Sequence, residues 1–176
     1  MVYMRRLVWH IASRLIILFV LVGILACGFF MCLNLANVYV VVTDGMEQRA
    51  AVILEKEGTE ELSKFFTAEF IASDPALAAV FDGTGIYNYY DITSYSYKLS
   101  VEKIWSWPWD DYATMTVVER IPNLVGKVLS GYSAQVSSST APAYEGGRYV
   151  ITLKKSEDGQ WLIAGMRQTE KILEAA

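Results

Sequence analysis

The sequence predicts an α+β protein in which an N-terminal transmembrane helix precedes a layer of helices packed on an antiparallel sheet. Three patterns support this prediction. No charged residue occurs between Leu15 and Thr43. Apolar residues then recur at helical spacing as far as Phe81, and beyond Gly85 they alternate with a period of two, as in half-buried strands. Because helices come first and strands follow, the two kinds of element are expected to form separate layers.

The composition separates one apolar segment from an ordinary globular remainder. Hydrophobic residues make up 53% of the chain and charged residues 19%, and all 19 acidic residues lie beyond Thr43. The net charge of −4 argues against nucleic acid as a partner, because binding phosphates requires a surplus of Lys and Arg. We therefore expect three regions: a cytoplasmic segment at residues 1–14, a transmembrane helix at 15–42 and an extracytoplasmic α+β domain at 43–176.

The basic residues set the expected orientation in the membrane. Arg5, Arg6 and Arg14 precede the apolar run Leu15–Leu33, whereas Asp44 follows it. The positive-inside rule places the N-terminus in the cytoplasm and the remainder outside. The run is long enough to cross a hydrocarbon core of about 30 Å. The expected localisation is a single-pass cell-membrane protein whose first partner is the bilayer, through residues 15–42.

Two other fates of the apolar segment stay open. A cleaved signal peptide has an apolar region of about 7–15 residues and a small-residue cleavage site, whereas this run continues well past Ala26. The sequence Ile24-Leu25-Ala26-Cys27 loosely resembles a lipoprotein processing box, in which a lipidated Cys27 would become the N-terminus. An apolar stretch, and not a polar tether, follows Cys27. An uncleaved anchor fits these features best.

Three helices are expected after the apolar run. The first spans Asp44–Glu57 and is ended by Gly58. Thr59 caps the second, and Asp74-Pro75 opens the third, which runs to Phe81. The second helix carries an apolar stripe of Leu62, Phe65, Phe66 and Phe70.

The remainder predicts antiparallel strands. Alternation from Tyr95 to Val101 marks one strand, and Ala113–Ile121 returns as the next after a turn at residues 108–111. Residues 130–147 are small, polar and rich in Gly and Ser, which predicts a loop or an irregular sheet edge. Arg148–Lys155 and Trp161–Gly165 form a hairpin around Glu157-Asp158-Gly159-Gln160. Residues 168–173 either extend the last strand or form a helical turn.

The order of elements over about residues 44–167 resembles the nuclear-transport-factor-2-like superfamily. So does the closing pattern Gly147–Leu153 followed by Gly159-Gln160-Trp161-Leu162-Ile163. The resemblance implies a cone-shaped fold in which a strongly bent sheet wraps a long helix. Members include enzymes, ligand-binding modules and assembly modules, and the enzymes typically place an Asp–His pair in the cone. A single span before such a domain is similar to bacterial envelope-assembly proteins.

The outer region lacks the side chains that most catalytic sites need. The one histidine, His10, precedes the span, and both cysteines, Cys27 and Cys32, lie inside it. A zinc site and Cys- or Ser–His-type nucleophilic catalysis are thereby excluded from the outer region. We expect no metal, no cofactor and no enzymatic activity. Catalysis by carboxylates alone would need a deep pocket enclosing Glu119 or another acid.

Two charges interrupt the apolar faces of neighbouring strands. Lys103 interrupts the face that includes Tyr97, Trp105 and Trp107, and Glu119 interrupts that of the next strand. If the hairpin closes around residue 111, Lys103 and Glu119 lie opposite each other. The alternative is a β-bulge that turns Lys103 to water.

Aromatic residues crowd the segment from Tyr87 to Tyr112, either to fill the core and shield the sheet or to form a binding surface. The candidate ligand- or partner-binding residues are Tyr97, Lys103, Trp105, Trp107 and Glu119. The leading hypothesis is a non-catalytic, membrane-anchored extracytoplasmic protein-interaction module, such as a subunit of an envelope assembly, that binds a protein partner or associates with itself. The alternative is a domain that binds or senses a small molecule or cell-wall fragment in the cavity of the cone.

Overall fold

The computed structural model describes residues 2–107 and 109–173, and its fold is α+β, as predicted. A long helix, α1 (Val2–Glu55), comes first, followed by short helices and then strands. The short helices are η1 (Thr59–Lys64), α2 (Ala68–Ser73), α3 (Pro75–Phe81) and η2 (Ile86–Tyr89). The strands are β1 (Tyr90–Ser94), β2 (Lys98–Ser106), β3 (Tyr112–Arg120), β4 (Val125–Val128), β5 (Glu145–Lys155) and β6 (Trp161–Leu173).

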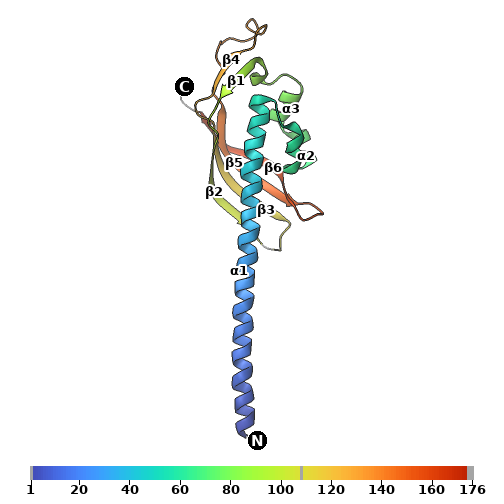
Figure 1. Cartoon of the computed structure of the whole chain (residues 1–176), viewed down its shortest axis with the longest axis vertical. Helices are drawn as coiled ribbons and strands as arrows, with labels where there is room; N and C mark the ends of the chain where they lie inside the picture. The colour runs from blue at the N-terminus through green and yellow to red at the C-terminus, as the bar shows by residue number, and fades with distance from the viewer. Residues whose placement is uncertain (1, 108, 174–176) are drawn as a thin grey trace.

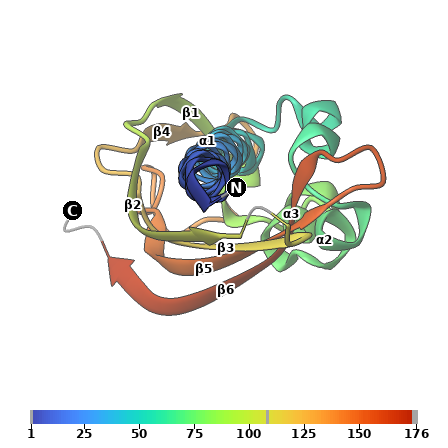
Figure 2. The ribbon, with the colours of Figure 1, turned by 90° about the horizontal axis from the view of Figure 1, so that it is seen from below.

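The main sheet is antiparallel, with the strand order β2-β3-β5-β6, and β1 and β4 form a separate antiparallel pair. Viewed along α1, the sheet curves around the helix, with β1 and β4 on one side and α2 and α3 near the β6 side (Figure 2). The core therefore lies between the upper part of α1 and the concave face of the sheet.

The exposed apolar run and the central helix of the domain are one continuous helix. The lower half of α1 projects from the domain (Figure 1), and most side chains between Leu15 and Leu33 are exposed. By length and composition, this helix is able to cross a membrane. A stripe higher on the same helix is buried in the core: Val38, Val42, Met46, Ala50 and Ile53. Val38 and Val42 thus belong to the core although they lie inside the range 15–42.

A close helix–sheet approach depends on Gly45. A Cβ atom there would lie 2.9 Å from Phe65 Cβ and 3.1 Å from Ile163 Cδ1. These separations are shorter than carbon atoms adopt in contact. Gly45 therefore lets α1 lie directly against the segment before α2 and the start of β6.

The expected second helix is divided in two by a contact with the sheet. Ile163 N donates to Phe65 O at 2.7 Å and Thr67 N donates to Ile163 O at 3.0 Å. These bonds pair the chain at Phe66 with β6, so the helix that starts at Thr59 ends at Lys64. The Thr67 side chain then caps α2 by accepting from Phe70 N. The third helix is confirmed: Asp74 caps α3 and Pro75 occupies its first turn.

The pairing of β2 with β3 contradicts the predicted Lys103–Glu119 pair. Residues 98–101 pair regularly with residues 120–117, but the register shifts between Val101 and Lys103. Lys103 therefore lies opposite Thr116, and Glu119 lies opposite Leu99. The alternative prediction, a β-bulge that leaves Lys103 exposed, is confirmed.

The bulge also reverses the faces of the end of β2. Beyond it, Ile104 and Ser106 turn inward, whereas Trp105 is exposed. The expectation that Trp105 and Trp107 share the inner face with Tyr97 is therefore wrong. One additional residue in a strand moves every later side chain to the opposite face.

The end of the chain follows the predicted hairpin. β5 and β6 pair around a turn in which Gly159 has a φ of 78°, a conformation that glycine adopts at no steric cost. Residues 168–173 extend β6, so the strand alternative holds for this segment. Strands β1 and β4 are short and were not predicted.

We predict that Val42→Ala lowers the free energy of unfolding by about 2 kcal/mol, because it removes two methyl groups from the core. Val40→Ala is the matched control, since Val40 is 51% exposed on the same helix whereas Val42 is 0% exposed. Urea unfolding of the full chain in detergent micelles measures both changes. Equal losses in the two variants would mean that α1 is not part of the core at this level.

Candidate binding pocket

A buried ion pair ties α1 to the start of α3. Arg49 Nε lies 2.6 Å from Asp74 Oδ2, and Arg49 Nη2 donates to Asp74 Oδ1 at 3.2 Å. The two side chains are only 6% and 2% exposed. Asp74 Oδ1 also accepts from Ala76 N at 2.8 Å, so one carboxylate both caps the helix and binds the guanidinium.

Each member of this pair keeps its partner ionised. Burial alone would raise the pKa of Asp74, but the hydrogen bond and the positive charge of Arg49 lower it below its ordinary value. Burial likewise would lower the pKa of Arg49, but Asp74 and other nearby groups raise it. The pair therefore stays charged although it is out of water.

An open pocket of about 660 Å³ lies beside the ion pair. Its walls come from the start of α3, from η2, from the loop at residues 142–145 and from β6 at residues 164–168. The volume falls within the range of small-molecule sites. The groups that line it include the Arg49–Asp74 pair, three tyrosines and an amide: Arg49, Asp74, Tyr87, Tyr144, Tyr149 and Gln168.

Hydrogen bonds hold the pocket walls in place. Tyr87 donates to Ala143 O at 3.2 Å, which fixes the loop against η2. Gln168 Nε2 donates to the Tyr149 hydroxyl at 3.3 Å, so β6 and β5 present these two side chains together. The Tyr87 and Tyr144 rings stack with centroids 6.3 Å apart. The pocket thus offers aromatic faces beside fixed polar groups.

Glu119 lies behind the pocket and does not line it. It projects from β3 to the inner side, is 0% exposed, and accepts from the Tyr144 hydroxyl through Oε2 at 3.3 Å. Its Oε1 atom and the Tyr97 hydroxyl are buried without a hydrogen-bond partner among the described residues. Burial raises the pKa of Glu119, and the charge of Arg49 and the hydrogen bond from Tyr144 offset part of that effect. Glu119 is therefore an acid whose neutral form the core favours.

The five predicted site residues do not form one site. Tyr97 and Glu119 come together in the core, where burial and the nearby Glu119 charge raise the pKa of Tyr97. Lys103, Trp105 and Trp107 lie exposed at the other end of β2, on or beyond the bulge.

The pocket residues Arg49, Asp74, Tyr144 and Tyr149 were missed by the sequence analysis. A signal existed for Arg49, because it is the only basic residue between Arg14 and the end of α1 at Glu55. Asp74 was identified only as a helix cap. Tyr144 lies in a stretch that reads as loop, so nothing in its neighbourhood indicated burial.

The acids that line the pocket are engaged in ion pairs. Asp74 binds Arg49, and Glu145 Oε2 lies 3.0 Å from Lys171 Nζ. Glu119 is separated from the pocket by residues such as Tyr144, which contacts both. Within residues 2–107 and 109–173, no cluster of His, Cys, Asp or Glu is suited to hold a metal ion. The arrangement is therefore suited to hydrogen bonding and to ring contacts more than to proton transfer.

We predict that Asp74→Asn destabilises the fold by about 3–5 kcal/mol, because Arg49 is then buried without a counter-charge. The amide oxygen of asparagine can still cap α3, so the loss reports the ion pair and not the cap. Asp82→Asn, at the exposed opposite end of α3, is the control and should change stability by less than about 0.5 kcal/mol. Chemical unfolding of the full chain in micelles provides the measurement.

We predict that Glu119→Gln becomes more stable relative to the parent chain as the pH rises above about 5. Above the unfolded-state pKa of about 4.3, the unfolded chain releases the Glu119 proton whereas the folded chain retains it. The parent therefore loses about 1.4 kcal/mol per pH unit until the pH reaches the raised folded-state pKa. Unfolding both proteins across this pH range gives the difference, and a difference that does not vary with pH would contradict a raised pKa.

A scan of the chain against models of known protein families matches none of them, and a search of curated proteins finds no matching relative.

Proposed function

We propose that this chain is a non-catalytic, single-pass membrane protein that presents a recognition domain outside the cytoplasmic membrane. In this proposal, the domain binds an extended segment of a protein partner along the free edge of β6, and a side chain of that segment enters the adjoining pocket. The observation that carries the proposal is the position of this edge directly beside the pocket.

The anchor part of the proposal rests on α1. Its exposed apolar run is preceded by Arg5, Arg6 and Arg14 and followed by acidic residues. This distribution favours a cytoplasmic N-terminus and a domain on the far side of the membrane. The chain then displays its pocket to partners in the cell envelope, in keeping with a subunit of an envelope assembly.

The recognition part rests on β6. This strand ends the order β2-β3-β5-β6, and only its start is covered, by the Phe66–Ile163 bridge. From residue 164 onward, its outer edge pairs with no described strand. An uncovered edge presents N–H and C=O groups that can pair with an extended polypeptide. Because Gly165, Met166 and Gln168 of the same strand line the pocket, a paired segment would run past its mouth.

The non-catalytic part rests on the state of the acids. Asp74 and Glu145 are held by cations, and Glu119 is enclosed in the core. A general acid or base must come within hydrogen-bond reach of its substrate. Glu119 could do so only if the Tyr144 side of the pocket opened.

We also propose that the domain belongs to the cone-shaped nuclear-transport-factor-2-like superfamily. The curvature of the sheet around α1 supports this assignment (Figure 2). The closing strand–turn–strand pattern of the sequence, which forms β5 and β6, also supports it.

The pocket itself favours a second candidate, the binding of a small molecule such as a cell-wall fragment. Its volume suits a ligand of that size, and Tyr87 and Tyr144 present ring faces beside the Arg49–Asp74 pair. A ligand with several hydroxyl groups would find both donors and acceptors there.

Site-specific photo-crosslinking in intact cells tests the proposal. The photoreactive amino acid p-benzoylphenylalanine replaces Arg167 on the β6 edge or Ile86 on the pocket wall; both side chains are exposed. We expect an adduct of the same protein mass from both positions. Glu157, in the exposed β5–β6 turn, is the control position and should give no such adduct.

A pocket-filling variant separates specific from incidental capture. Ala76→Phe places a ring in the pocket and should abolish the adduct, whereas Ala72→Phe, on exposed α2 surface outside the pocket, should preserve it. A small adduct mass that Ala76→Phe also abolishes would favour the second candidate. Equal yields of the protein adduct from all three positions would refute the proposed site. So would an adduct yield that Ala76→Phe leaves unchanged.

A further inference from the structure

We propose that the aromatic tip of the β2–β3 hairpin docks into the outer headgroup interface of the bilayer that α1 crosses. The aromatic tip is defined as Trp105, Trp107, Trp109 and Tyr112. This inference rests on the membrane-anchor part of the proposed function and is independent of what binds the pocket.

The tip is fixed to α1 at the level where the apolar run ends. Asn34 Nδ2 donates to Ser106 Oγ at 2.7 Å and to Trp107 O at 3.3 Å. Asn34 Oδ1 accepts from Trp161 Nε1 at 2.9 Å. One side chain of the helix thus binds the end of β2 and the start of β6, so the hairpin cannot move away from this level without breaking these bonds.

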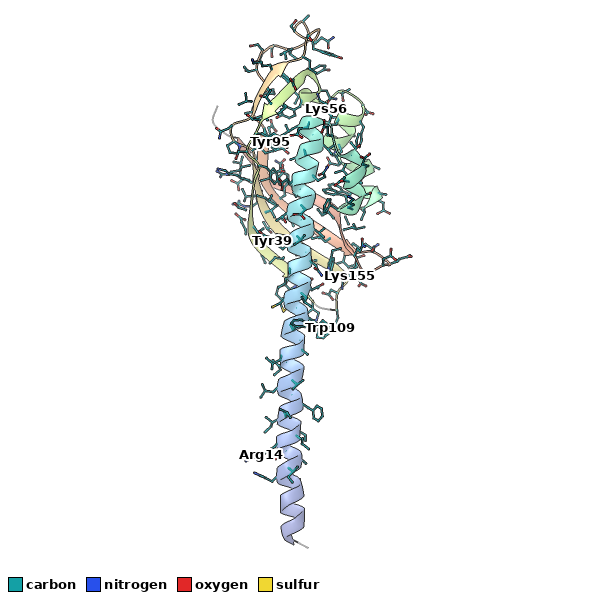
Figure 3. The ribbon with its side chains drawn as sticks, viewed as in Figure 1. Arg14, Tyr39, Lys56, Tyr95, Trp109 and Lys155 are labelled. Atoms are coloured by element: carbon teal, nitrogen blue, oxygen red, sulfur yellow. The ribbon has the colours of Figure 1, made fainter. Side chains whose placement is uncertain are left out.

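Trp109 extends from the hairpin toward the membrane-spanning part of α1. It lines a surface hollow together with Cys27, Phe30 and Leu33 of the helix, and it lies beside α1 at the lower end of the domain (Figure 3). A helix rises about 1.5 Å per residue, so the run Leu15–Leu33 spans about 28 Å, close to the thickness of a hydrocarbon core. If the run fills that core, Trp109 lies in its outer half, just below the headgroup boundary.

The side chains of the tip have the chemistry of that boundary. Trp105 is 54% exposed and Trp109 69% exposed, and the Trp107 and Trp109 rings lie 5.5 Å apart. Tryptophan and tyrosine are enriched where hydrocarbon meets headgroups, because an apolar ring carries a polar N–H or O–H. Exposed indoles grouped in this way are otherwise unfavourable on a surface that faces only water.

The charges near the tip indicate contact through rings and not through electrostatic attraction. Lys155 Nζ donates to Asp110 O at 3.4 Å and lies 4.8 Å from the centroid of the Trp161 ring. Two acids, Asp110 and Asp111, are exposed beside it, so the tip carries no net positive charge. Docking should therefore occur on zwitterionic lipid and should persist at high salt.

Depth-dependent fluorescence quenching tests this inference on the full chain in phosphatidylcholine vesicles. The reporter variant carries Trp9→Phe, Trp105→Phe and Trp107→Phe, which leaves Trp109 and the buried Trp161. The vesicles contain phosphatidylcholine brominated near the headgroup end or near the methyl end of its acyl chains. We expect Trp109 to lose most of its emission to the shallow bromines and little to the deep ones, at low and at high salt.

Two control variants isolate the Trp109 signal. Adding Trp109→Phe leaves Trp161 alone and gives the background. Adding Trp109→Phe and Tyr132→Trp moves the reporter to the loop after β4, at the end of the domain far from the N-terminus (Figure 1), and should show only background quenching.

The inference would be overturned if the brominated lipids quenched Trp109 no more than they quench the reporter in the Tyr132→Trp control. A crosslink between two copies of this chain from p-benzoylphenylalanine at position 109, without quenching, would assign the tip to self-association instead. Quenching that appears only with anionic lipid and disappears at high salt would also contradict docking by the rings. Because none of these results involves the pocket, they are distinguishable from failure of the proposed recognition site.

Discussion

The structure depends on α1 carrying both the exposed apolar run and the central stripe of the core. A single stripe of α1 faces the sheet, because its members recur every four residues. They are Asn34, Val38, Val42, Met46 and Ala50. Along the described helix, no linker separates the exposed apolar run from this stripe. The domain therefore has a fixed height and rotation relative to the helix that carries it, unlike a domain tethered by a flexible segment.

The centre of the domain buries three charged residues: Arg49, Asp74 and Glu119. Burial raises the pKa values of Glu119 and Tyr144, which contact each other, and the positive charge of Arg49 offsets part of this rise. Buried charges cost desolvation free energy and rarely improve stability over apolar side chains. Here they position α3 and the loop at residues 142–145, which are two walls of the pocket. The buried polar groups thus contribute more to the shape of the pocket than they add to the stability of the fold.

Local sequence patterns predicted which helices and strands form, whereas tertiary contacts determined where some of them end. The cap at Asp74 and the turn at Gly159 depend on neighbouring residues, so the sequence predicts α3 and the last hairpin correctly. The division of the second helix depends on Ile163, about one hundred residues away, and no local pattern carries that information.

The candidate site was harder to predict for the same reason. The bulge after Val101 changes which side chains share a face, so alternation alone grouped Trp105 with Tyr97 incorrectly. Asp74 and Arg49 are 25 positions apart, and their pairing becomes visible only once α3 is placed against α1. The distance of the Arg49–Asp74 pair above Asn34 follows from the geometry of α1. From Asn34 to Arg49, α1 rises about 22 Å at 1.5 Å per residue. If Asn34 marks the outer boundary of the bilayer, the pocket opens well above the lipid. With the topology proposed above, a partner that binds there must itself reach that height, which favours envelope proteins with extracytoplasmic segments over proteins confined to the membrane.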